Sequence, residues 1–476
     1  HGSIRRQRQM CIRDRCSSTV VVGFSTNRRF ISKALKRTTA QTNNKLQSIK
    51  RIIIKGDDEM STSSSNSPAN DAATATDPAV VDAAGSLIVP KPNKILKYKT
   101  GSDSDSSVIY LYGDSSCEKI AICCAGYADD HTIFQSFADK LAKQGNTFVG
   151  VICLPGYDNP SPDDGVSWET SHNKDGYSYN DWSNSIRDAV KTIRNESTFI
   201  GGIGKTKFTG IFHDWGVLGG TIWLNRTLKE YEELKKEINQ EGSSSLCEDD
   251  DISLLFKPNN VIYLDVLVGS SKSKLKELST QEKEELVVMT KKPTTKQLLC
   301  EILYKIALAI SFLIQRYISK HIAWLNYIFG ITFLSIFQLD PLYKWDLQSS
   351  SAIYQQNNRT KSISNVIYMA YPYWYLFKEI FATIVNNNKS SNSILNEFVL
   401  HSNWKQTPIL YMYGTKKKCN FHDYTSIALL EREEKLQLSK SKVIPVENAG
   451  HYLYIQQQDL CLTAIIKFMD NDTTTA

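Results

Sequence analysis

Short apolar segments alternate with longer amphipathic segments along most of this chain, from about residue 107 to about residue 470. Apolar runs of strand length occupy residues 108–112, 120–124, 148–154, 208–212, 261–266, 409–413 and 443–446. Between them, apolar residues recur at helical spacing in residues 134–143, 182–193, 218–230, 426–436 and 460–468. Strands that alternate with helices favour a mostly parallel sheet with helices on both faces. The pattern therefore predicts an α/β fold.

The pattern changes between residues 270 and 405, where the strand-length runs disappear. Residues 297–339 are strongly apolar, and residues 322–339 form an uncharged run of eighteen. That length is at the lower limit for a membrane span, although polar residues such as Asn326 and Gln338 dilute its hydrophobicity. We interpret the segment as a helical lid over an apolar pocket, with a lid that dips into a membrane as the alternative. Both interpretations imply a hydrophobic substrate.

These patterns divide the chain into four segments. Residues 1–100 are predicted to be a disordered or artefactual N-terminal extension, 101–269 the first part of the core, 270–405 the lid and 406–476 the second part of the core. Within the extension, residues 27–55 are basic and poor in acids, which is typical of an organellar transit peptide. Localisation stays open between the cytoplasm and an organelle, with membrane association as an alternative.

The composition limits the kinds of partner molecule that we expect. The 476 residues include 56 Lys and Arg and 50 Asp and Glu, for a net charge of +6, and no basic stripe with interleaved aromatic residues follows residue 100. We therefore expect no nucleic-acid partner. The ten cysteines include no Cys-x-x-Cys pair, which suits a reducing compartment or buried thiols.

We expect neither a cofactor nor a metal. Residues 201–206 end in Gly-Lys-Thr, but the first glycine of a phosphate loop would fall at Phe199, and a strand follows instead of a helix. The triplet Asp129-Asp130-His131 supplies too little geometry for a metal site. Its acids fit the N-terminus of a helix better.

The run His213-Asp214-Trp215-Gly216 carries the most specific chemical signal. It follows the apolar run 208–212, as expected for a strand that stops in a sharp turn and restarts as a helix. Where lipases and esterases present a serine at such a turn, this chain presents an aspartate. A carboxylate forms a useful ester only when it displaces a good or strained leaving group, such as a halide or an epoxide oxygen.

Two further motifs follow in chain order. The strand 261–266 ends near Asp265, and residues 445–452 place His451 in a loop after the last strand. We call the strand–turn–helix at residues 213–216 the elbow. Together with the elbow, these motifs resemble the α/β-hydrolase superfamily over roughly residues 107–470, and within it the epoxide hydrolases and haloalkane dehalogenases. The resemblance implies that Asp214 is the nucleophile, that His451 activates water and that Asp265 is the acidic partner of His451. Asp423, beyond the next strand, is the alternative acid.

The same resemblance implies an oxyanion hole made by two backbone N–H groups, those of Trp215 and Tyr127. The turn at Tyr127 reads Cys-Ala-Gly-Tyr-Ala, without the histidine and proline usual in the family. Dehalogenases often hold the halide with an asparagine in this turn, so a tyrosine there favours epoxides. Phe212 is a second departure, because the elbow normally carries a small residue at that position. We expect the helix to shift or the ring to find a gap.

Epoxide opening also requires an acid for the leaving alkoxide, and the resemblance implies tyrosines of the lid. Tyr371 and Tyr373, in the proline-stiffened run 371–375, are the candidates. The leading hypothesis is a hydrolase that acts on a hydrophobic epoxide through an aspartyl ester. The alternatives are a haloalkane dehalogenase, and a catalytically silent hydrolase fold that binds an apolar ligand or a membrane surface.

Overall fold

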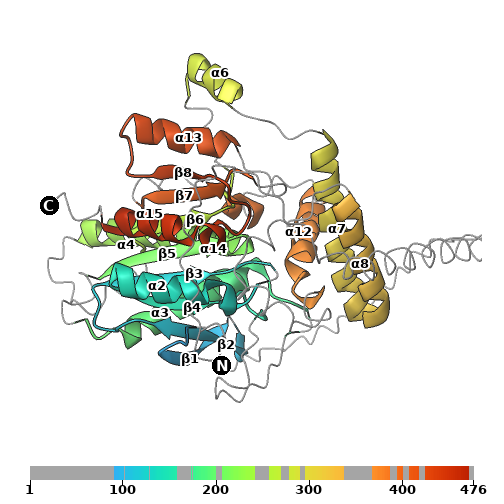
Figure 1. Ribbon diagram of the computed structural model, residues 1–476, viewed down its shortest axis with the longest axis horizontal. Helices are drawn as coiled ribbons and strands as arrows, with labels where there is room; N and C mark the ends of the chain where they lie inside the picture. Colours follow the sequence, from blue (N-terminus) through green and yellow to red (C-terminus); the bar gives the residue numbers. More distant parts are fainter. Residues whose placement is uncertain are drawn as a thin grey trace, which may run out of the picture. The chain divides into compact units, whose positions relative to one another are not determined.

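The computed structural model describes residues 90–100, 102–127, 129–157, 173, 175–199, 206–241, 257–269, 278–289, 295–336, 367–385, 394–399, 407–416 and 424–470. Eight strands of these residues form one sheet, in the order β1-β2-β4-β3-β5-β6-β7-β8 (Figure 1). Their bounds are β1 Lys94–Thr100, β2 Ser102–Tyr112, β3 Lys119–Cys124, β4 Thr147–Ile152, β5 Lys207–His213, β6 Asn260–Leu264, β7 Ile409–Gly414 and β8 Lys442–Val446. All neighbours from β4 to β8 pair in parallel, and β2 alone runs opposite to the rest.

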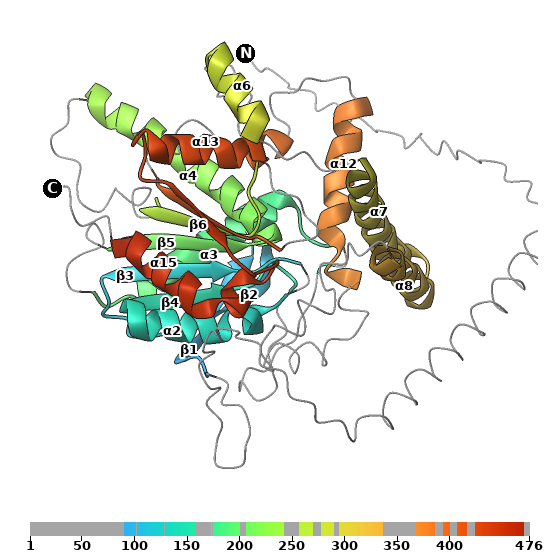
Figure 2. The ribbon, with the colours of Figure 1, turned by 45° about the horizontal axis from the view of Figure 1, so that its top comes forward.

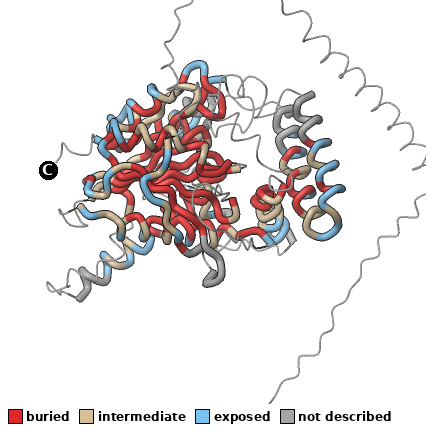
Figure 3. Tube along the Cα trace, turned by 60° about the horizontal axis from the view of Figure 1, so that its bottom comes forward, coloured by how far each residue is buried: buried red, intermediate tan, exposed pale blue. Residues whose placement is uncertain are grey.

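Helices cover both faces of the sheet, as the alternating pattern predicts. Within β3, Ile120, Ile122 and Cys124 join one buried cluster, while Ala121 and Cys123 join another. The first cluster includes residues of α3 (Tyr179–Glu196), α4 (Trp215–Glu241) and α13 (Tyr424–Lys435). The second includes residues of η1 (His131–Phe134), α2 (Gln135–Gly145), α14 (Leu453–Gln456) and α15 (Gln458–Asp470). The strands between them are buried on both sides (Figure 3).

The sheet begins earlier than the sequence patterns predict. Residues 94–100 were assigned to the N-terminal extension, but they form β1, which pairs with β2 from Lys94–Leu111 onward. Lys94 and Lys97 are exposed, Ile95 is partly buried and Tyr98 is buried. Lysines are typical of an edge strand, because they discourage pairing with other chains. They also lower the apolar density of the segment, which is why its pattern resembles a polar tail.

Phe212 is accommodated by two glycines. Its ring is fully buried between β5 and α4, where a Cβ atom on Gly220 would come within 2.6 Å of the ring. A Cβ atom on Gly210, two residues earlier in β5, would also come within 2.6 Å. The ring therefore occupies the space that these two missing side chains leave, and packs near Trp223 and Tyr263. Of the two expected outcomes, the ring has found a gap.

Among the described residues of the predicted lid, five helical elements are present. They are α6 (Thr280–Met289), α7 (Thr295–Tyr317), α8 (Lys320–Ile336), α12 (Tyr371–Val385) and the 3-10 helix η5 (Ile394–Phe398). Figures 1 and 2 both place α12 between α7 and the end of the sheet. The last three residues of the predicted apolar run 322–339 lie outside the described residues. Among the helices that the structure describes, none has the length and hydrophobicity needed to cross a membrane.

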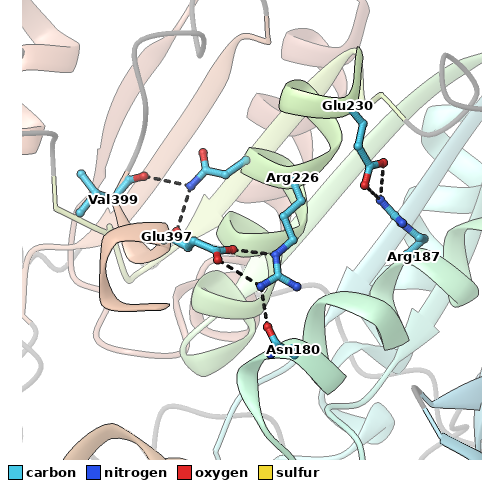
Figure 4. Close-up of polar contacts among 7 residues, drawn as sticks. Asn180, Arg187, Arg226, Glu230, Glu397 and Val399 are labelled. Carbon is cyan, nitrogen blue, oxygen red and sulfur yellow. Dashed lines mark hydrogen bonds and ion pairs between the residues drawn. The ribbon is translucent and has the colours of Figure 1, made fainter. Parts of the chain in front are cut away.

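Hydrogen bonds tie the segment 367–399 of the predicted lid to the core near its start and near its end. Before and at the start of α12, Tyr157 donates to the carbonyl of Met369, and Tyr179 donates to that of Pro372 at 3.0 Å. At the chain's return, η5 is held on α4: Arg226 Nε donates to Glu397 Oε2 at 2.6 Å (Figure 4). The Asn225 amide also donates to the carbonyls of Glu397 and Val399 at 2.9 and 3.0 Å. These contacts fix both ends of the segment 367–399 relative to the sheet.

Candidate active site

The turn between β5 and α4 places Asp214 at the carboxyl edge of the sheet. Asp214 has a φ of 52°, in the left-handed region of the backbone that residues other than glycine seldom adopt. Such strain persists where the surrounding structure holds it, and it is common at functional sites. Here the adjoining strand approaches so closely that a Cβ atom on Gly126 would lie 2.4 Å from Trp215 N and 2.6 Å from Asp214 Oδ2. Only glycine fits at position 126.

The carboxylate of Asp214 accepts a hydrogen bond from the turn after β3. Tyr127 N donates to Asp214 Oδ2 at 2.9 Å. Asp214 itself retains an exposed fraction of 7%. Tyr127 is one of the two residues predicted to form an oxyanion hole, and Trp215, the other, follows Asp214 directly. A backbone N–H that already binds one carboxylate oxygen is placed to stabilise negative charge on that oxygen.

The structure brings His451 and Asp265 into contact. His451 Nδ1 donates to Asp265 Oδ2 at 2.5 Å, and both residues are buried. Asp265 follows β6 with a φ of 66°, and its N–H donates to the carbonyl of Met412 in β7 at 2.7 Å. The loop that carries His451 is closed by Gln456, whose side chain accepts from Gly450 N at 2.6 Å. The alternative acid, Asp423, lies outside the described residues.

The side chain of His213 holds the loop that carries His451 through its main chain. Its Nε2 donates to the main-chain carbonyl of His451 at 3.1 Å, because a carbonyl can only accept. Its Nδ1 is then the acceptor for the hydroxyl of Tyr454, 3.5 Å away. The two imidazole rings lie with their centroids 4.5 Å apart. These contacts give His213 a structural role, because its ring holds the main chain of His451 in position.

The atoms of His213, Asp265 and His451 lie close enough to suggest a metal site. One ligand atom from each falls within 4.8 Å of the others. Two of these groups are already joined by the Asp265–His451 hydrogen bond, and His213 Nε2 is turned to a carbonyl. A metal ion would have to displace both bonds. The cluster therefore fits a proton-handling pair with a backbone support better than a ligand set.

The two candidate tyrosines of α12 lie in different surroundings. The Tyr371 hydroxyl donates to the carbonyl of Pro155 at 2.7 Å and accepts from Trp182 Nε1 at 3.1 Å. Burial raises the pKa of this hydroxyl well above its ordinary value. Its proton is committed to the Pro155 carbonyl, so Tyr371 serves as an anchor of α12 on the core.

Tyr373 instead lies over the elbow. Its ring packs edge-on against Trp215, with centroids 4.9 Å apart, and edge-on against Tyr127 at 5.2 Å. Tyr304 of α7 lies behind it at 5.9 Å. Burial raises the pKa of the Tyr127 hydroxyl well above its ordinary value, so this phenol stays neutral. Aromatic rings therefore pack against Trp215 and Tyr127, and of the two candidates Tyr373 is the one beside the predicted oxyanion residues.

Sequence patterns did not indicate the residues that position α12. Tyr157, Tyr179 and Trp182 come from the core, and each bonds a residue of the segment 369–372 nearly two hundred positions away or more. Local periodicity predicts their burial but carries no signal for such pairings. The aromatic density of residues 371–375 is the one local sign that this segment packs against other rings.

The remaining sequence candidates are accounted for locally or lie outside the described residues. Asp130 caps η1, accepting from Thr132 N at 3.0 Å, and His131 stacks on Tyr110 with centroids 3.6 Å apart. The acidic triplet therefore starts a helix, as expected. Residues 200–205, which hold most of the apparent phosphate loop, are not among those described.

The strand order, with β2 alone reversed, and the strained turn after β5 define the α/β-hydrolase fold. No family model matches the chain, and no curated protein matches it. Solved structures similar to it include the epoxide hydrolase CorEH, at 11% identity and a TM-score of 0.41 over 79% of this chain and 99% of that one. An epoxide hydrolase from metagenomes of hot environments gives 12% and 0.42 over 79% and 98%.

A thermophilic esterase from Thermogutta terrifontis is similar at 10% identity and a TM-score of 0.40, over 80% of this chain and all (100%) of that one. Identities and scores this low carry no argument about activity, because one fold hosts many reactions. The assignment of the fold rests on the strand order and the elbow, and the chemistry rests on the residues of the site.

Proposed function

We propose that this protein is a hydrolase that opens an epoxide on a hydrophobic molecule through a covalent ester of Asp214. One observation carries the proposal: a carboxylate stands at a strained strand–helix turn, with one oxygen 2.9 Å from the Tyr127 N–H. A carboxylate that only capped the helix would not need the left-handed backbone or the close approach of Gly126. The buried Asp265–His451 pair at the same sheet edge supplies the base for a second step.

In the first step, Asp214 Oδ1 attacks an epoxide carbon, and the C–O bond of the ring breaks. Oδ2 keeps its bond from Tyr127 N and becomes the carbonyl oxygen of the ester. The departing alkoxide takes a proton from a tyrosine hydroxyl, and we assign this to Tyr373 because its ring packs on both Trp215 and Tyr127. Tyr371 is not assigned, because its hydroxyl already bonds Pro155.

In the second step, a water attacks the ester carbonyl carbon and gives its proton to His451 Nε2. The Asp265 carboxylate holds Nδ1–H, so that Nε2 is the basic nitrogen and the imidazolium is stabilised. The tetrahedral oxyanion forms on Oδ2, where the N–H groups of Tyr127 and Trp215 stabilise it. Collapse releases a diol, whose new hydroxyl takes the proton back from His451. The proton left on the Asp214 carboxyl then passes through solvent to the Tyr373 phenolate, which restores both groups.

The surroundings favour an epoxide over an alkyl halide. A halide leaves without a proton and needs N–H donors, whereas an alkoxide needs an acid, and the rings around Asp214 are tyrosines. The same rings, with Trp215 among them, suit an aryl or long-chain substrate. A silent fold remains the opposing hypothesis. Phe212 and the unusual turn at Tyr127 are its support. The Phe212 ring occupies the space beside Gly210 and Gly220, and Tyr127 N still donates to Asp214.

Trapping the ester tests the proposal directly. A His451→Gln variant, incubated with a mixture of aryl and long-chain epoxides, is expected to stop after the first step. The peptide that carries Asp214 should then gain the whole mass of one epoxide, because ring opening expels nothing. Mass spectrometry of the digested protein measures the gain. With haloalkanes, the peptide would gain the alkyl group alone and free halide would appear.

Two controls sharpen the result. The double variant Asp214→Asn/His451→Gln should give no adduct, which places the ester on that side chain. After one turnover of the unaltered protein in ¹⁸O-water, the label should enter Asp214 and not the product, because water attacks the ester carbonyl. Absence of an adduct with both substrate classes, in a folded His451→Gln protein, would favour the silent fold.

His213 provides a separate prediction about the second step. His213→Leu leaves the buried His451 carbonyl without its 3.1 Å donor, so the loop should shift and hydrolysis of the ester should slow roughly 10- to 100-fold. His213→Gln offers an amide donor near the position of Nε2 and should restore much of the rate. Single-turnover decay of the ester measures both variants. An unchanged rate in His213→Leu would contradict the positioning role.

A further inference from the structure

Helices α7 and α8 form a fixed pair, here called the α7–α8 hairpin (residues 295–336). The side-chain amide of Asn326 on α8 donates to the Ala307 carbonyl at 3.0 Å and to Ser311 Oγ at 2.7 Å on α7. One helical turn later, a Cβ atom on Gly330 would already lie 3.0 Å from the Cβ of Ala307. These contacts set the rotation of α8 against α7, and so decide which residues face outward.

The inner side of α7 faces the predicted active site. Tyr304 contacts Tyr373, and Phe312 lies 6.3 Å from the Tyr371 ring, centroid to centroid. Arg316, near the end of α7, forms an ion pair with Asp175 of the core. The hairpin is therefore connected to the sheet through α12 and through this ion pair.

The turn of the hairpin exposes several large apolar residues. We call them the tip patch: Tyr317, Ile318, Ile322, Trp324 and Leu325. Tyr317 and Ile318 are each 69% exposed, and Leu325 is 60% exposed. Figure 3 shows exposed positions along the outer side of this group of helices. Single exposed apolar residues are ordinary, but five large ones within residues 317–325 mark a surface that meets another apolar phase.

The charge around the tip patch selects the kind of partner. Residues 302–339 contain Lys305, Arg316 and Lys320 and no Asp or Glu. Lys320 is exposed at the turn itself, and the Arg316 guanidinium lies 4.7 Å from the centroid of the Tyr317 ring. Tryptophan and tyrosine beside lysine and arginine are the residues that occupy the headgroup level of a bilayer. Arg316 is paired with Asp175, so Lys320 supplies the exposed positive charge at the turn, and an anionic lipid surface is complementary to it.

The geometry points to the tip patch as a docking surface for the face of a bilayer that contains anionic lipid. Ile318, Leu325 and their neighbours enter the boundary between headgroups and acyl chains, and Lys320 contacts lipid phosphates. Docking brings the bilayer to the outer side of α7, one helix away from Tyr373. A hydrophobic substrate dissolved in the bilayer would then lie next to the aromatic rings that pack against Trp215 and Tyr127. The docking itself does not depend on the reaction proposed for Asp214.

Vesicle flotation of the full chain tests this surface. The protein is mixed with vesicles of phosphatidylcholine alone, and of phosphatidylcholine with about one third phosphatidylglycerol. It should float with the anionic vesicles, and less so as salt is raised. The double variant Ile318→Asp/Leu325→Asp should bind at least about tenfold more weakly, because two charges must enter the interface. Lys320→Glu should also weaken binding.

The chain offers a matched control at a different surface. Leu436 and Leu438, just after α13, are 52% and 49% exposed, so Leu436→Asp/Leu438→Asp adds the same charge at two other exposed aliphatic residues. This variant should bind like the unaltered protein. Equal loss in both double variants would mean that net charge matters and the tip patch does not. Thermal unfolding of each variant verifies that it is folded.

Three results would overturn the inference. The first is failure to bind either kind of vesicle, and the second is equal binding to neutral and anionic vesicles. The third is a dimer, detected by light scattering, that the double variant Ile318→Asp/Leu325→Asp converts to a monomer. The last would mean that a second copy covers the patch. Asp214→Asn should bind vesicles like the unaltered protein, so a failed adduct experiment and a failed flotation experiment remain separate outcomes.

Discussion

Asp265→Asn is expected to lower steady-state turnover of an epoxide roughly 10⁴-fold while the ester on Asp214 still forms. Asp265 is fully buried and accepts from His451 Nδ1 at 2.5 Å, so it fixes which imidazole nitrogen carries the proton. An amide can donate to Nδ1 instead and stabilise the tautomer in which Nε2 is protonated. Nε2 then cannot take a proton from water, whereas attack by the Asp214 carboxylate needs no base.

Rapid-mixing kinetics separates the two steps of this prediction. The variant should consume about one equivalent of substrate in a burst, followed by a very slow steady state. Asp459→Asn, on the exposed face of α15 and paired with Lys140, makes the same chemical change away from the site and should leave turnover intact. If Asp265→Asn kept most of its activity and Asp423→Asn lost it, Asp423 would be the acid. Loss of the burst would instead contradict the division into two steps.

Gly126→Ala is expected to reduce activity by about 10²- to 10³-fold, by moving the elbow rather than by removing a reacting group. The new methyl group would lie 2.4 Å from Trp215 N and 2.6 Å from both Cβ and Oδ2 of Asp214. Two of these atoms cannot rotate away, because they belong to or adjoin the backbone of the turn. Either the turn or the Tyr127 N–H must withdraw, and the 2.9 Å bond to Oδ2 is lost.

The stability of the variants distinguishes this local effect from general unfolding. Overpacking of this kind costs about 1–3 kcal/mol in the free energy of unfolding, which urea titration measures. Gly219→Ala on α4 is the matched control, because its nearest neighbour is a flexible Ile186 methyl group 3.2 Å away. Alanine favours a helix over glycine by about 1 kcal/mol, so this control should keep its activity and most of its stability. Full activity in Gly126→Ala would refute the assigned oxyanion geometry.

Periodicity predicted most of the sheet because strands buried on both faces must be apolar along their whole length. Seven predicted runs correspond to β2 to β8, and five predicted helical segments correspond to α2, α3, α4, α13 and α15. β1 was missed because three of its seven residues are lysines, as is typical of an edge strand, and these lower its apolar signal. The α/β-hydrolase fold could therefore be predicted from the chain, except at its first edge.

The candidate site divides in the same way between local and distant information. Asp214, Asp265 and His451 each follow a strand, and the carboxyl ends of parallel strands share one edge, so strand order alone predicts that they converge. The choice between Tyr371 and Tyr373 could not be made from the sequence. It depends on Pro155 and Trp182, which are close to Tyr371 only in the folded chain.

By itself, the sequence determined the α/β architecture, the carboxylate at the elbow and the order of acid and histidine, because strand periodicity and turn chemistry are local properties. Only the tertiary structure decided that Gly210 and Gly220 make room for Phe212, and that His213 supports the His451 backbone. It also decided which side of α7 faces outward, through Asn326 of α8. These features depend on side chains that are distant in the chain and meet at a few ångströms, and no local pattern records such distances.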